Sequence, residues 1–159
     1  ILGRSRIVGT LVFVDPGGNS AIQGPLVWEP ARNNFPSLLC DDTIDITLDS
    51  TFALSEAAFG LNFNPPGTPY PYLGGTTNTT SADTYPTRMT GLMYTVKDFV
   101  FSNRPDISGV VIANGKIDVK ATSLNLSYIN TYLNDPPPGF DIGTIEMKVV
   151  PGTWNRSID

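Results

Sequence analysis

One pattern occurs twice in this chain, as Gly91-Leu-Met-Tyr-Thr-Val-Lys-Asp-Phe-Val-Phe101 and as Gly109-Val-Val-Ile-Ala-Asn-Gly-Lys-Ile-Asp-Val119. Each copy contains a glycine, an apolar triplet, a turn and an alternating strand, and the offset between them is 109 − 91 = 18 residues. Similarity at a fixed spacing is typical of stacked units that bury their apolar faces against one another. The two copies therefore predict neighbouring rungs of a single-stranded β-solenoid with about 18 residues per rung.

Four apolar side chains define the core that this alignment predicts. Phe99 and Phe101 of the first copy correspond to Ile117 and Val119 of the second, and polar residues alternate with them as in a half-buried strand. We expect the four to stack in one buried column, with strands about 4.8 Å apart. A β-sandwich in which the two strands are similar by chance is the alternative, and Asn114-Gly115 would then be a hairpin turn.

The rest of the chain fits one domain over residues 1–159, a length that can bury a substantial core. The expected parts are rungs at about 7–54 and 89–128, a Pro/Thr-rich loop excursion at 55–88 and a C-terminal cap at 129–159. Within the cap, Ile145 to Val150 is a strand candidate. At the other end, we expect the strand from Gly9 to Val14 to be an unpaired edge that docks another chain.

Composition supports a turn-rich all-β protein, because the chain has 15 Gly, 14 Pro and only 16% charged residues. The net charge of −5 argues against a nucleic-acid partner, whose phosphates require a basic surface. The chain contains no histidine, which excludes Ser-His and Cys-His catalysis and metal sites with histidine ligands.

The densest acidic cluster consists of Asp41, Asp42, Asp45 and Asp49. Paired carboxylates serve glycosidases as acid and base, and carboxylate oxygens also bind calcium. No Gly-rich calcium-loop spacing accompanies them, so we interpret the cluster as solvated positions beside a turn. We therefore expect no catalytic residue, no metal and no cofactor.

Three tyrosines of the excursion, Tyr70, Tyr72 and Tyr85, form a candidate binding loop. Their rings could stack on sugars or on the apolar face of a partner. The alternative is that they hold the loop against the rest of the domain.

Three stretches resemble a known family: the segment from Ser108 to Val119, Pro136-Pro-Pro-Gly-Phe140, and Val149-Val-Pro-Gly-Thr-Trp154. They resemble the surface-exposed C-terminal domains of planctomycete-type pilus-assembly (PilX-type) and prepilin-like proteins. The rung pattern is also similar to that of bactofilin-like, polymer-forming β-helices. The resemblance implies a β-helical surface domain that follows a hydrophobic N-terminal helix, and it brings no catalytic residues.

These observations favour a non-enzymatic, exported structural or assembly domain of the bacterial cell surface, or of a pilus-like or filamentous assembly. Its expected partners are further copies of itself or other surface subunits. Because the chain begins at Ile1 without a methionine, we expect its targeting segment, and any contact with the membrane, to lie outside this sequence. The alternative function is a carbohydrate-binding or carbohydrate-cleaving β-helix, with polysaccharide as the partner.

Overall fold

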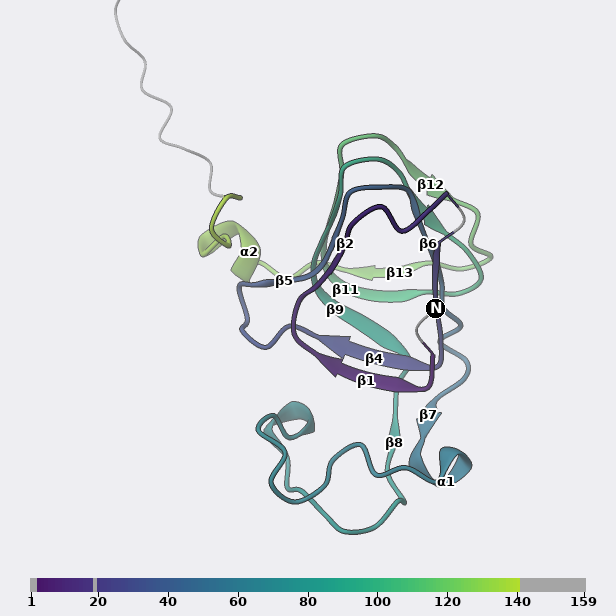
Figure 1. Ribbon diagram of the computed structural model, residues 1–159, viewed down its shortest axis with the longest axis vertical. Coiled ribbons are helices and arrows are strands. Elements are labelled where there is room, and N and C mark those ends of the chain that lie inside the picture. Colours follow the sequence, from purple (N-terminus) through teal and green to yellow (C-terminus); the bar gives the residue numbers. More distant parts are fainter. Residues whose placement is uncertain (1–2, 19, 141–159) are drawn as a thin grey trace, which may run out of the picture.

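The computed structural model describes residues 3–18 and 20–140, and this part of the chain is mostly β-strand (Figure 1). The large sheet has seven strands: β1 (Ser5–Val8), β2 (Leu11–Phe13), β4 (Leu26–Glu29), β5 (Pro36–Cys40), β9 (Arg88–Thr95), β11 (Asp106–Ala113) and β13 (Asn125–Ser127). The small sheet has four: β3 (Ala21–Gln23), β6 (Ile44–Thr47), β10 (Phe99–Phe101) and β12 (Ile117–Val119). A two-stranded sheet pairs β7 (Leu54–Ser55) with β8 (Thr84–Tyr85). Helix is confined, among the described residues, to α1 (Glu56–Phe59), α2 (Thr131–Asn134) and a 3₁₀ turn, η1 (Tyr72–Gly74).

All strand pairs in the two larger sheets are parallel, and the large sheet divides at β9. The start of β9 pairs with β4, where Met89 lies opposite Trp28. Its end pairs with β5, where Tyr94 lies opposite Leu39. The sheet order is therefore β1-β4-β9-β11-β13. A second branch starts at β9 and consists of β5 and then β2.

The β-solenoid expected from the sequence is wrong. Two parallel sheets and one small antiparallel sheet form the described part of the chain, with no solenoid or closed barrel in it. The 18-residue spacing relates only β9 to β11 and β10 to β12. The earlier strands β4 and β5 both pair with β9, but at other and unequal separations in the sequence. The alternative of a β-sandwich also fails, because the sheets of such folds are antiparallel, whereas both larger sheets here are parallel.

The hydrophobic core lies between the two larger sheets. Its largest fully buried side chains include Trp28, Met89 and Met93 from the large sheet and Phe99 and Phe101 from the small sheet. Burying each such side chain stabilises the fold by about 1.5–3 kcal/mol. The indole of Trp28 also donates a hydrogen bond of 3.0 Å to the carbonyl oxygen of Gly9, so its polar group is satisfied.

The expected core column is only half buried. Phe99 lies opposite Ile117 and Phe101 opposite Val119, at the 18-residue offset of the repeat. However, Ile117 is 47% exposed and Val119 is 54% exposed. The reason is topological: β12 is the last strand of the small sheet, so no further described strand covers its apolar side chains.

Residues 56–83 form an excursion between β7 and β8, and it lies beneath β1 and β4 in Figure 1. Ser55 caps α1 by accepting a hydrogen bond from the Ala58 amide. After β13 the chain forms α2 and reaches Phe140, whose ring packs edge-to-face on Tyr94 with centroids 5.6 Å apart. The strand expected from Ile145 to Val150, and most of the expected cap, lie outside the described residues.

Candidate functional site

Arg6 fastens the excursion to the large sheet. Its side chain is 5% exposed and forms a 3.0 Å ion pair with Glu29. The guanidinium also donates hydrogen bonds to the carbonyl oxygens of Phe63 and Tyr70, and it lies 5.8 Å from the centre of the Tyr72 ring. Arg6 therefore holds a loop against the end of the sheet where β1 lies.

The three tyrosines expected to form one binding loop have different roles. Tyr85 is buried, and its burial together with a hydrogen bond to Glu56 raises the pKa of its hydroxyl. Tyr72 packs edge-to-face on Tyr85, with ring centroids 4.9 Å apart. Tyr70 is 48% exposed. Tyr70 is thus the most exposed of the three, while the other two hold the excursion together.

Glu56 is the residue that organises the excursion. It is fully buried, and its carboxylate accepts hydrogen bonds from the amides of Phe63 at 2.6 Å and Asp83 at 3.1 Å. It also accepts a hydrogen bond from the Tyr85 hydroxyl at 3.0 Å. Glu56 was not among the site residues predicted from the sequence. The sequence signal for Glu56 is a lone carboxylate next to the apolar residues Ala57, Ala58 and Phe59.

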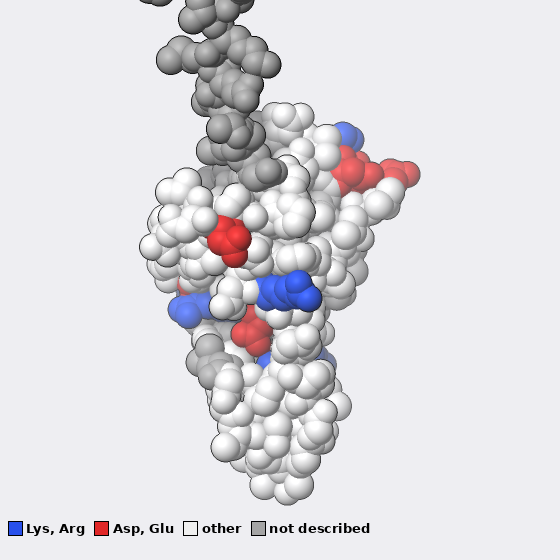
Figure 2. All heavy atoms as spheres, turned by 90° about the vertical axis from the view of Figure 1, so that its left-hand side faces the viewer, with Lys and Arg blue, Asp and Glu red and all other residues white. Residues whose placement is uncertain are grey.

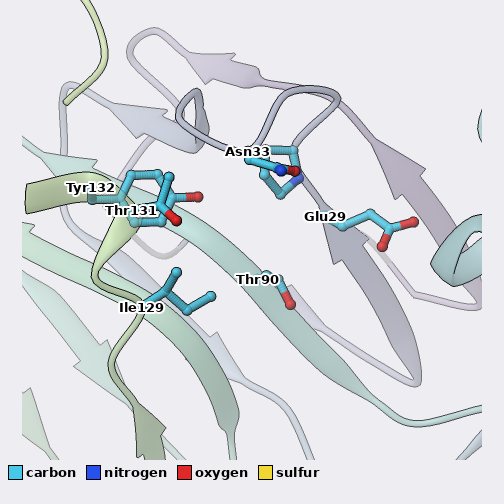
Figure 3. Close-up of a pocket in the computed structure, with 7 residues that line it drawn as sticks. Glu29, Asn33, Thr90, Ile129, Thr131 and Tyr132 are labelled. Atoms are coloured by element: carbon cyan, nitrogen blue, oxygen red, sulfur yellow. The ribbon is translucent and has the colours of Figure 1, made fainter. Parts of the chain in front are cut away.

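A surface groove begins beside Arg6 at the end of β4. Glu29, Pro30 and Asn33 line two hollows, one of about 290 Å³ and one of about 410 Å³. The first hollow is completed by Thr90, Ile129, Thr131 and Tyr132, which surround it in Figure 3. The second is completed by residues that include Val8, Pro69, Tyr70 and Pro71. We call this pair of hollows the Glu29 groove.

The Glu29 groove offers groups that can bind polar ligands. A carboxylate, an amide and two threonine hydroxyls face it from β4, the loop after β4, β9 and α2, and the exposed ring of Tyr70 lies at one end. Pockets of this kind bind by a few placed polar groups and an apolar or aromatic surface. Glu29 is the only carboxylate among the lining residues of the two hollows, whereas glycoside hydrolysis requires a pair.

The acidic residues singled out in the sequence do not converge on one point. Asp41 accepts a hydrogen bond from the Asp15 amide, and Asp42 forms an ion pair with Lys97. Asp45 accepts a hydrogen bond from the Ser102 hydroxyl, and Asp49 accepts one from the Thr51 hydroxyl. Hydrogen bonds from Lys97 and the Thr43 amide lower the pKa of Asp42, and hydrogen bonds from Thr51 lower the pKa of Asp49. Within the described ranges, no group of three or more Cys, Asp or Glu residues is placed to hold a metal ion.

The opposite end of the molecule from the excursion exposes the core. Ile117 and Val119 of β12 continue the columns of Phe99 and Phe101, and Leu126 of β13 continues that of buried Ile107. Each of the two strands pairs on one side only with a described strand. We call the exposed edges of β12 and β13 the open end. Sequence analysis placed Ile117 and Val119 in the core and therefore missed it.

No family model, curated protein or solved structure matches this chain. The resemblance to pilus-assembly, prepilin-like and bactofilin-like proteins therefore stays a prediction. In the part of the chain that the structure describes, no helix has the length and apolar character needed to cross a membrane.

Proposed function

We propose that this chain is a non-enzymatic, exported assembly domain that associates with a second copy of itself through the open end. The observation that carries the proposal is the exposure of Ile117, Val119 and Leu126 at positions that continue buried columns of the core. Inward-facing apolar side chains on unpaired edge strands favour pairing with another chain. The excursion contacts β1 through Arg6, at the opposite end of the large sheet from β13, so it does not cover the open end.

The charges of β12 favour a second copy as the partner. Lys116, Asp118 and Lys120 alternate with the apolar residues of this strand and its flanks. In an antiparallel pair of β12 strands centred on Val119, each Lys120 lies opposite the Asp118 of the other copy. Such opposite-charge cross-strand pairs contribute about 0.2–1 kcal/mol each. The same symmetry places Val119 against Val119, which closes the core of both copies in an isologous dimer.

Sedimentation at increasing protein concentration tests this association. We expect the wild-type domain to shift from monomer to dimer and Val119→Lys to remain a monomer, because the new charges would face each other at the symmetry axis. Leu61→Lys is the matched control, since it changes an exposed apolar residue of the excursion and should still dimerise. A wild-type domain that stays monomeric throughout, or equal loss of dimer in both variants, would refute the proposal.

Export is the second part of the proposal, supported by the low charged fraction of 16% and by the family resemblance. Antibody labelling of intact and permeabilised producing cells tests it. Exposure on the surface predicts equal labelling of both, whereas labelling only after permeabilisation would contradict it.

A second candidate function is carbohydrate binding in the Glu29 groove. The observation that favours it is the exposed ring of Tyr70 next to the polar side chains of the groove. We expect a polysaccharide array to retain the domain, Tyr70→Ala to abolish retention, and Phe52→Ala, an exposed aromatic outside the groove, to preserve it. Equal retention of the two variants would remove the groove as the binding site. We expect no glycan turnover by the wild-type domain, and turnover that Asp41→Asn together with Asp45→Asn abolishes would contradict this expectation.

A further inference from the structure

An apolar row crosses the outer face of the large sheet. Val12 lies opposite Leu39, Leu39 opposite Tyr94, and Tyr94 opposite Ile112, so the row spans the adjacent strands β2, β5, β9 and β11. The preceding residues of β5 and β9, Leu38 and Met93, are fully buried in the core. Because side chains alternate along a strand, the row points away from the core.

One half of this row borders an apolar hollow. Val14 and Val96 follow two residues after Val12 and Tyr94 and face the same side. Val12, Val14 and Val96 are 62%, 74% and 43% exposed. Together with Leu39, Tyr94 and Phe140 they line a space of about 280 Å³, which we call the outer hollow. Exposed apolar side chains gathered in this way indicate a surface that another segment covers.

The chain itself covers the neighbouring part of the same face. Leu92, two residues before Tyr94, is buried, and it lines a second hollow together with Tyr132 of α2 and with Phe140. Phe140 then packs on Tyr94 and forms one wall of the outer hollow. The side of the molecule seen in Figure 2 is mostly uncharged, with its charged residues in a band across the middle and a group at the upper right. The chain thus already follows this face up to residue 140, and residues 141–159 continue from there.

The sequence beyond Phe140 has the pattern of a strand with one apolar face. Ile145, Met147 and Val149 alternate with Glu146 and Lys148. Four residues separate Phe140 from Ile145, and an extended chain covers about 3.3–3.6 Å per residue. Tyr94 lies two strands from Val12, which is about 10 Å at the usual strand spacing. The segment is therefore long enough to reach every residue of the outer hollow.

We propose that Ile145, Met147 and Val149 pack into the outer hollow, against Val12, Val14 and Val96, with Glu146 and Lys148 facing solvent. The C-terminal segment is thereby an intramolecular cover for the outer face of β2, β5 and β9. The open end belongs to β12 and β13, so this docking leaves the dimer edge free. The two proposals stand on different surfaces and can fail separately.

Disulfide mapping in the full chain tests the contact. Val12→Cys is combined in turn with cysteine at 145, 147 and 149, and with cysteine at 146 and 148 as the matched controls. After mild oxidation at a concentration where the protein is monomeric, peptide mass spectrometry measures the intramolecular disulfide. Cys40 is buried, and burial raises the pKa of its thiol, which disfavours its participation.

We expect at least one apolar position to give about fivefold more intramolecular disulfide than both control positions, because a disulfide requires Cα atoms within about 7 Å. Phe140→Ala in the best pair should lower the yield, whereas Phe52→Ala should not. Equal yields at alternating positions, no disulfide at any position, or disulfides only between molecules would overturn the proposal. The last outcome would mean that a second copy occupies the outer hollow.

Discussion

Phe101 and Val119 occupy matching positions on neighbouring strands, yet only Phe101 is enclosed on both sides of its strand. We expect Phe101→Ala to lower the free energy of unfolding by roughly 3–5 kcal/mol, because it leaves a cavity beside Phe99. Val119→Ala, the control in the same column, removes a half-exposed side chain and should cost less than about 1.5 kcal/mol in the monomer. Urea unfolding measures both, and equal losses would show that the core extends fully to β12.

The buried carboxylate of Glu56 should be needed to hold the excursion in its folded form. Glu56→Ala leaves the amides of Phe63 and Asp83 without their acceptor, and each unpaired buried donor costs about 1–3 kcal/mol. Glu56→Gln keeps one acceptor oxygen, so it should be less damaging. We expect limited proteolysis to cleave the excursion fastest in the alanine variant. Identical cleavage of wild type and Glu56→Ala would show that the carboxylate does not hold the loop.

At the scale of elements, β9 and β11 leave no room for a side chain where two glycines meet. Gly109 lies opposite Gly91, and a Cβ atom added to Gly109 would stand 2.0 Å from the Gly91 carbonyl oxygen. Gly109 also has a φ of 148°, which side chains rarely tolerate. We expect Gly109→Ala to destabilise the domain by about 3 kcal/mol or more, by separating the two strands. Gly18→Ala, where an added Cβ meets open space, is the control, and similar thermal unfolding of the two variants would contradict the prediction.

The internal repeat predicts the pairing of these elements but not the complete fold. Aligning Gly91 with Gly109 is sufficient to find the register of β9–β11 and β10–β12, because matching apolar positions must face the same core. The branching at β9 has no comparable signal, since the pairing of β9 with β4 and β5 depends on contacts across the long excursion. The exposure of Ile117 and Val119 was also missed, because an apolar alternation is the same in an edge strand and an inner strand.

The candidate sites show the same division. The tyrosines of the excursion could be found from the local sequence, and one of them, Tyr70, borders the Glu29 groove. Asn33, Thr90 and Thr131, by contrast, are scattered along the chain and converge only through the sheet and α2. Polar residues brought together by tertiary structure leave no local pattern to detect.

For the molecule as a whole, two carboxylates make stability depend on pH. The pKa values of Asp42 and Asp49 are lowered in the folded protein by hydrogen bonds from Lys97 and Thr51, respectively. As the pH falls, these two carboxylates are protonated first in the unfolded chain, near their ordinary pKa of 3.8. Their contribution to the stability of the folded protein is therefore complete above pH 3.8. We expect the free energy of unfolding to decrease as the pH falls below 3.8 through the lower folded values. Asp42→Asn and Lys97→Gln should each flatten this decrease in urea titrations, and an unchanged slope in both would contradict the assignment.

The branch at β9 determines the order in which a nascent chain can fold. Before β9 leaves the ribosome, the described strands of the two larger sheets can form only separate parallel pairs, β1 with β4, β2 with β5 and β3 with β6. β9 joins the first two pairs, and β10 connects to the third. At about 5–20 residues per second, synthesis from the end of β5 to the end of β9 takes several seconds. Throughout that interval Trp28 and Leu38 lack the neighbours that β9 supplies, so the half-translated chain exposes apolar surface that the finished domain buries.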